Sequence, residues 1–222
     1  MKKNRNKVIT RFFITTMLLT VLFSCSKNNS SDIQKQEMPD LTATRQNVNL
    51  DDSVFAQYSN SVVEAMFEIA STSIGYDEWV FKVDSILNSP DTPSFSSIFG
   101  NLQQLNDSSY KQLFDSFFMN IGTIDVCHSA EMVERQLLLS SCNENEKFFY
   151  LGVLSYMKTM LEAVEGMQEY MPGPGYDRYL DCMREKHANM NWADWTAFVL
   201  GIPESFVWEV ASCIWDATHQ EQ

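Results

Sequence analysis

Three side chains in the C-terminal part of the chain have the chemistry and spacing of a site for a soft metal ion. Met183, His187 and Met190 are separated by four and three residues, so one continuous helix would carry all three on the same face. Thioether and imidazole ligands together suit an ion such as Cu(I). In the structural alternative, the two methionines fill gaps in the core and His187 lies near a helix end, where its positive charge is favourable. The sequence leaves both interpretations open.

Patterns that would predict catalysis are weak. Cys127 and His128 are adjacent, and adjacent side chains on a helix diverge by about 100°, so they cannot form a direct nucleophile–base pair. The Ser-x-x-Lys pattern occurs at 108–111 and again at 155–158, but the companion motifs of the enzyme class that uses it are missing. No carboxylate stands alone within an apolar stretch, so none is predicted to have a raised pKa. The sequence therefore favours a non-catalytic protein, and an enzyme with an unrecognised site is the remaining alternative.

Four of the five tryptophans fall in the last part of the chain, at Trp192, Trp195, Trp208 and Trp215. Trp208, Ala211 and Trp215 share a helical face, and apolar residues cover most of the remaining surface of that helix. A helix that is apolar nearly all round is usually buried, which predicts a core position. The alternative is a groove in which exposed tryptophans bind a hydrophobic or sugar ligand, or a partner helix.

The elements that position these residues are predicted to be helices, because apolar residues recur at helical spacing and strand signals are absent. The expected helices are 51–71, 77–88, 94–105, 108–120, 129–141, 143–171, 176–187, 192–200 and 203–217. Asp51 or Asp52 would cap the first, Gly201 would end the eighth, and Pro203 would lie in the first turn of the last. We expect an all-α protein, a single compact bundle of seven to nine helices over residues 51–222.

The longest expected helix, 143–171, carries a narrow apolar seam typical of helix–helix packing. Its apolar residues recur at alternating steps of four and three, at Tyr150, Leu154, Met157, Leu161 and Val164.

The N-terminus has the composition of an export signal. Residues 1–24 contain five lysines and arginines and no acidic residue, and residues 12–23 (FFITTMLLTVLF) are uncharged, too few for a normal membrane span. Leu22-Phe23-Ser24-Cys25 follows and resembles the lipobox of bacterial lipoproteins, although Phe23 departs from the usual small or polar residue. The resemblance implies cleavage before Cys25, acyl chains on that cysteine, and attachment to a membrane of the cell envelope. In such lipoproteins, an aspartate directly after the cysteine is the usual signal for retention in the inner membrane. Ser26 stands at that position, so the resemblance implies the outer membrane if the cell has two membranes.

Residues 1–24 are therefore predicted to be a lipoprotein signal peptide, and 25–50, which are polar and contain no aromatic residue, a flexible tether after the lipidated Cys25. An exported domain is exposed to oxidising conditions in which disulfides form. We expect Cys182 to pair with Cys213. A continuous helix would hold Cys127 and Cys142 about 22 Å apart, far beyond the roughly 7 Å between bridged Cα atoms, and the pairing of these two cysteines stays open.

The charge of the chain restricts its partners. The formal net charge is −13, and loss of the leader with its five positive charges would leave −18. Such a domain would repel the phosphates of nucleic acid. The sequence predicts a membrane-anchored interaction or binding protein of the cell envelope that has no cofactor. An envelope protein is its expected partner, and a copper-binding envelope protein is the alternative.

Overall fold

The computed structural model describes residues 52–88, 109–141, 144–171 and 173–219, all within one compact unit that spans residues 40–222. Several predictions fall outside these ranges. They concern the signal peptide 1–24, the lipidated Cys25 with segment 25–50, the helix expected over 94–105, and Cys142.

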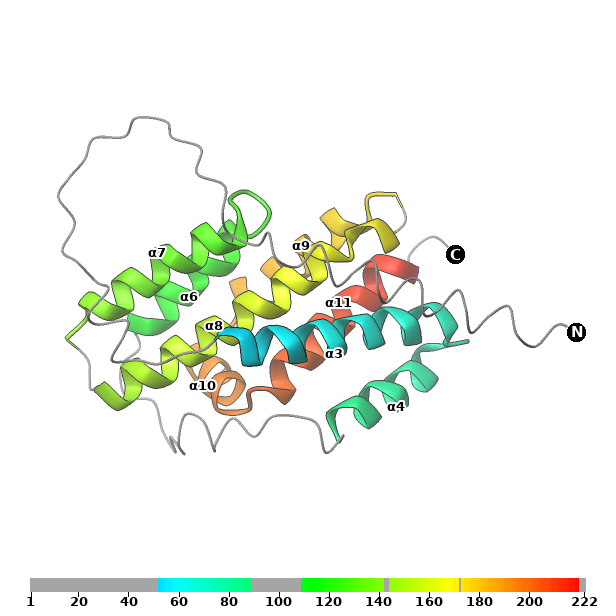
Figure 1. Cartoon of the computed structure of the whole chain (residues 1–222), viewed down its shortest axis with the longest axis horizontal. Helices are drawn as coiled ribbons and strands as arrows, with labels where there is room; N and C mark the ends of the chain where they lie inside the picture. The colour runs from blue at the N-terminus through cyan, green and yellow to red at the C-terminus, as the bar shows by residue number, and fades with distance from the viewer. Residues whose placement is uncertain (1–51, 89–108, 142–143, 172, 220–222) are drawn as a thin grey trace, which may run out of the picture. The chain divides into compact units, whose positions relative to one another are not determined.

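The described part of the chain is all-α, which confirms the predicted fold class. It contains eight α-helices, a short 3-10 helix at Gln168–Tyr170 and no strand. The α-helices, drawn in Figure 1, are α3 (Asp52–Thr72), α4 (Tyr76–Leu87), α6 (Ser109–Asn120), α7 (Val126–Leu139), α8 (Glu144–Gly166), α9 (Gly175–Ala188), α10 (Trp192–Leu200) and α11 (Glu204–His219).

Helix α8 lies at the centre of this arrangement, with α3 and α7 packed against it. All five residues of the predicted seam are buried, but so are most other positions between Glu146 and Val164. The expectation of a narrow seam was therefore wrong: neighbouring helices cover α8 on nearly every side. Small or hydroxyl-bearing side chains such as Gly152 and Thr159 leave room for this, and the Thr159 hydroxyl lies 3.0 Å from that of Ser59 on α3 in a buried hydrogen bond.

Helix α11 supplies the second large part of the core, in contact with α3, α4, α9 and α10. Its buried residues are Phe206, Val207, Val210, Ala211, Cys213, Ile214 and Ala217. They occupy most of the circumference of the helix, as its sequence predicts.

Local capping sets two helix starts. Helix α7 begins three residues earlier than expected because the Asp125 side chain caps it, accepting from the backbone N–H of His128. The Asn191 side chain caps α10 by accepting from Ala193 and Asp194. That helix has the predicted bounds, and Gly201 follows its last residue as expected.

Two other boundaries differ from the predictions. Pro203 was expected in the first turn of α11, but it precedes the helix, and its carbonyl accepts from the backbone N–H of Val207. The long helix α8 ends at Gly166 rather than near Met171, because the chain tightens into the 3-10 turn over Gln168–Tyr170.

Among the described helices, no single one has the length and apolar composition to cross a membrane. Helices α10 and α11 pass that test only when taken together, and the break between them is bent by 104°.

Candidate functional site

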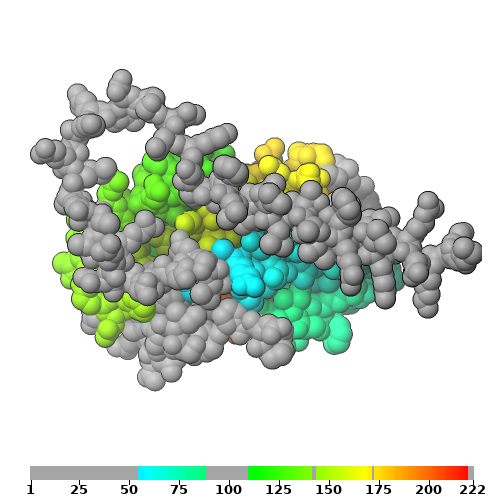
Figure 2. Space-filling model, in the orientation of Figure 1, coloured from blue at the N-terminus to red at the C-terminus, as the bar shows by residue number. Residues whose placement is uncertain are grey.

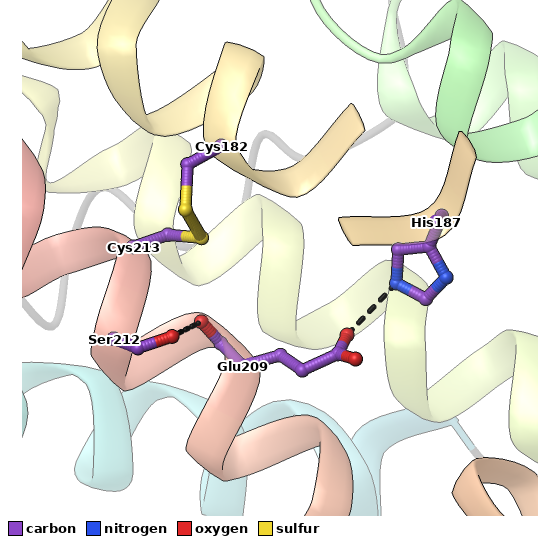
Figure 3. Close-up of a disulfide and its surroundings, with 5 residues drawn as sticks. All are labelled: Cys182, His187, Glu209, Ser212 and Cys213. Atoms are coloured by element: carbon purple, nitrogen blue, oxygen red, sulfur yellow. Dashed lines mark hydrogen bonds and ion pairs between the residues drawn. A yellow bond between two sulfur atoms is a disulfide. The ribbon is translucent and has the colours of Figure 1, made fainter. Parts of the chain in front are cut away.

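A disulfide joins α9 to α11, as predicted: Cys182 is bonded to Cys213, with their Cα atoms 5.6 Å apart (Figure 3). The two cysteines are 31 residues apart in the sequence. The bridge therefore closes a loop that contains the end of α9, all of α10 and the start of α11.

A second link between the same two helices lies beside the disulfide. His187 on α9 places its Nε2 atom 2.8 Å from Oε2 of Glu209 on α11 (Figure 3). The distance suits an ion pair, but the donor and acceptor angles at these two atoms are outside the range of a hydrogen bond. Cys213 follows Glu209 by four residues and Cys182 precedes His187 by five, so we call these four residues the α9–α11 joint.

The histidine of the α9–α11 joint is deeply buried. Its ring stacks on Phe118 of α6, with centroids 3.4 Å apart and planes 5° from parallel, and Phe198 meets it edge-on. Only 2% of its side chain is exposed, and Nδ1 has no hydrogen-bond partner among the described residues. The imidazole therefore lies within the packed core, where it links α9 to α11.

The predicted metal ligands occupy different settings. Met183 is fully buried on α9, whereas Met190 is half-buried and lies beyond the helix, after the capping residue Asn189. The premise that one continuous helix carries all three side chains was therefore wrong, because α9 ends at Ala188. Metal binding by Met183, His187 and Met190 stays a prediction. Within the described ranges, no group of three His, Cys, Asp or Glu side chains could hold a metal ion.

The tryptophans predicted as a possible ligand surface belong largely to the core. Trp195 is fully buried against Phe114 and Phe198, which excludes it from any exposed groove. The other three, Trp192, Trp208 and Trp215, are half-buried and pack against the core. Trp195 is thus a core residue, and a ligand surface stays a prediction only for the other three.

The sequence interpretation did not single out Trp79, which packs against Trp208 and Trp215. Trp79 on α4 is fully buried, and its ring centroid lies 5.4 Å from that of Trp215 and 6.2 Å from that of Trp208. The available signal was the spacing of Trp79, Val83 and Leu87, which recur every four residues and form the buried face of α4.

Carboxylates gather where α7 begins beside α8. The pKa of Glu165 is raised above its ordinary value, first by burial and then by the negative charges of Asp125 and Glu162. Burial, with Glu165 and Asp177 nearby, also raises the pKa of Tyr176 to about 12. The expectation that no carboxylate has a raised pKa was wrong, because these acids come from two separate segments and only the tertiary structure brings them together.

In two of the other candidate catalytic patterns, a key side chain is bound to a carboxylate. The Cys127 thiol donates to the Glu162 carboxylate, while His128 lies exposed on the next position of the helix, so the two diverge as expected. In one Ser-x-x-Lys pattern, Lys111 is bound by both carboxylate oxygens of Asp115, within 2.9 Å. That lysine is therefore engaged by an acid one turn away on the same helix.

A surface feature stands apart from all these groups. Ile74 precedes α4 and is 98% exposed, and Phe81 on α4 is 73% exposed. The neighbours of Phe81 on the outer side of the helix include Asp77, Glu78 and Asp84, all exposed. We call these five residues the α4 outer face; the helix lies at the surface beside α3 in Figure 2.

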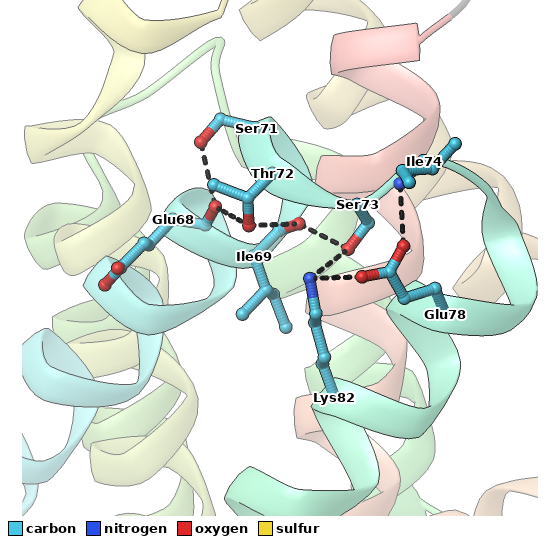
Figure 4. A network of polar contacts seen from close by, with 8 residues as sticks. All are labelled: Glu68, Ile69, Ser71, Thr72, Ser73, Ile74, Glu78 and Lys82. Atoms are coloured by element: carbon cyan, nitrogen blue, oxygen red, sulfur yellow. Dashed lines mark hydrogen bonds and ion pairs between the residues drawn. The ribbon is translucent and has the colours of Figure 1, made fainter.

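Polar contacts fix the backbone at this surface. The carboxylate of Glu78 accepts from the backbone N–H of Ile74 at 2.9 Å and pairs with Lys82 at 2.8 Å (Figure 4). Lys82 also reaches the Ser73 hydroxyl, which in turn donates to the carbonyl of Ile69 in the last turns of α3. The turn between α3 and α4 is therefore held in one conformation, with Ile74 pointing away from the core.

Comparison with known proteins adds no relative: no family model matches the chain, and neither does any curated protein or solved structure.

Proposed function

We propose that the protein is a lipid-anchored, non-catalytic interaction protein of the cell envelope. The lipobox-like residues at Cys25 and the basic, apolar leader support the anchor. The observation that carries the interaction role is the α4 outer face, where two large apolar side chains are presented to solvent on a rigid turn. Exposed apolar residues rimmed by polar ones are typical of protein-binding surfaces.

The distribution of reactive groups supports a role without catalysis. The imidazole of His187 stacks on Phe118 in the core, and the indole of Trp195 packs against Phe114. The half-buried Cys127 faces a carboxylate, which does not favour the thiolate that a nucleophile needs.

The proposal is tested on the full-length protein, purified in mild detergent through a C-terminal tag and compared with a Cys25→Ala variant. Intact-mass measurement should find a mature chain that begins at Cys25 and carries acyl chains, and the variant should lack both the cleavage and the lipid. An envelope protein should co-purify in a fixed ratio with the lipidated protein and be lost with the variant.

Two results would contradict the proposal. An unmodified Cys25 would remove the anchor, and lipidated protein that elutes alone after crosslinking in intact cells would remove the interaction role. In the second case, the copper content of the protein would be measured next.

A further inference from the structure

We infer that the α4 outer face docks a basic amphipathic segment of a partner protein, whose apolar side chains cover Ile74 and Phe81 while its lysines or arginines meet the surrounding carboxylates. This rests on the proposed interaction role and names the chemistry of the partner.

The exposure of Phe81 is not explained by the packing of its own helix. Helix α4 buries one face completely, through Trp79, Val83 and Leu87, so it has a defined inner and outer side. Phe81 belongs to the outer side and leaves 73% of its surface in water. Ile74 lies in the turn before α4, and its backbone N–H is bonded to the carboxylate of Glu78, which is one helical turn from Phe81.

The charge around the two apolar side chains is almost entirely negative. Residues 52–88, which form α3 and α4, contain six carboxylates and a single basic residue, Lys82. That lysine is already paired with Glu78. Asp77 and Asp84 flank Phe81 within one turn on either side, and Glu64 and Glu68 are exposed on α3.

This pattern selects among possible occupants. Anionic lipid and other acidic surfaces are repelled by these carboxylates. A second copy of the chain would bring the same negative charge to an identical patch, and like charges across an interface oppose association. A segment with one apolar face and a basic rim satisfies both the apolar side chains and the carboxylates, as amphipathic helices do in apolar grooves.

The probe for the test is a fluorescent synthetic peptide of about 18 residues, made of leucine and lysine in a helical pattern with one apolar face. Its binding is measured by fluorescence anisotropy on the full-length lipidated protein in nanodiscs of zwitterionic lipid, with empty nanodiscs subtracted. A peptide of the same pattern with glutamate in place of lysine is the charge control.

The lysine peptide should bind, and the glutamate peptide should bind at least ten times more weakly. The Ile74→Ser/Phe81→Ser variant should lower the affinity at least tenfold, and Asp77→Asn/Asp84→Asn should lower it and reduce its dependence on salt. Leu139→Ser is the matched control: Leu139 is 62% exposed, at the end of α7, and its loss should leave binding unchanged.

Equal binding to all these variants, or to both peptides, would overturn the inference. So would self-association of the protein that disappears with Ile74→Ser/Phe81→Ser, which would assign the surface to a second copy. Binding of protein to lipid vesicles through Phe81 would assign it to the membrane. If the peptide fails while an envelope protein still co-purifies with the lipidated chain, the docking surface is wrong but the proposed function stands; if both fail, both are wrong.

Discussion

The α9–α11 joint and the α4 outer face differ in which side chains they expose to water. The joint buries polar side chains, and the outer face exposes apolar ones. In the joint, the His187 imidazole is withdrawn from water against Phe118 and Phe198, and it pairs with the Glu209 carboxylate near a disulfide. At the outer face, an isoleucine and a phenylalanine are left in water among carboxylates. Residue types that suggest chemistry are thus used for packing, and residue types that suggest packing lie at the surface.

The difference shows where a function can be sought in this molecule. A buried polar pair explains how two helices keep their register, but it offers nothing to a partner. The exposed apolar side chains of Ile74 and Phe81 contribute little to the fold, and they carry the proposed binding role. Substitutions should therefore separate stability from binding, and the following predictions run from the largest expected change in stability to the smallest.

Trp79→Ala should have the largest effect. It removes a fully buried indole that contacts both Trp208 and Trp215, which lowers the free energy of unfolding by about 3–5 kcal/mol through lost burial and a cavity. Urea unfolding followed by circular dichroism measures the change. A loss below about 1 kcal/mol would mean that α4 is not anchored through this residue.

Removing the disulfide should come next. Cys182→Ser/Cys213→Ser opens a loop with a sequence separation of 31 residues, and the chain-entropy model gives a loss of about 3–4 kcal/mol. Unfolding is compared with that of the unchanged protein with and without reductant. Reductant should have no further effect on the double variant, while a Cys127→Ser control should keep the difference between oxidised and reduced protein.

Glu165→Gln should give a small gain that depends on pH. The folded state raises the pKa of Glu165, so its ionisation opposes folding: the penalty is absent below the ordinary value of 4.5 and grows as pH rises through the folded pKa. With allowance for screening of this half-buried group, the variant should be more stable at pH 7 by less than about 1 kcal/mol.

The same variant should show no gain below about pH 4, where the carboxyl is protonated in both folded and unfolded states. Glu169→Gln, at an exposed position four residues on, is the control and should change nothing across this range. A destabilised Glu165→Gln at neutral pH would show that the carboxylate of Glu165 has a favourable partner instead.

Ile74→Ser/Phe81→Ser should have the smallest effect on stability, within about 0.5 kcal/mol, because both side chains are already exposed. The same urea unfolding checks this. If the free energy of unfolding fell as much as with Trp79→Ala, Ile74 and Phe81 would belong to the core, and the contrast between the α9–α11 joint and the α4 outer face would be wrong.

The helical fold was predictable to a large extent because amphipathic periodicity and caps are local. Helix α10 has the predicted bounds, set by Asn191 and Gly201. The pairing of Cys182 with Cys213 also followed from the elements expected to carry them. The start of α7 was misplaced because the capping role of Asp125 was not recognised, although an N-cap aspartate is a signal that the sequence contains.

The candidate site was predicted less well. The extent of burial around α8 and the central place of Trp79 depend on which helices lie beside them. The pKa of Glu165 is raised first by burial and then by Asp125, which is distant in the sequence. The spacing of Trp79, Val83 and Leu87 could have indicated that Phe81 lies on the other side of α4, but its 73% exposure depends on which segments cover the helix.

The sequence by itself determined the helix content, the excess of negative charge and the lipobox-like Cys25, because each depends on composition or on neighbouring residues. Only the tertiary structure decided which side chains are buried. It placed His187 against Phe118 and left Phe81 in water, because burial depends on the contacts that a helix makes with distant segments rather than on the helix itself.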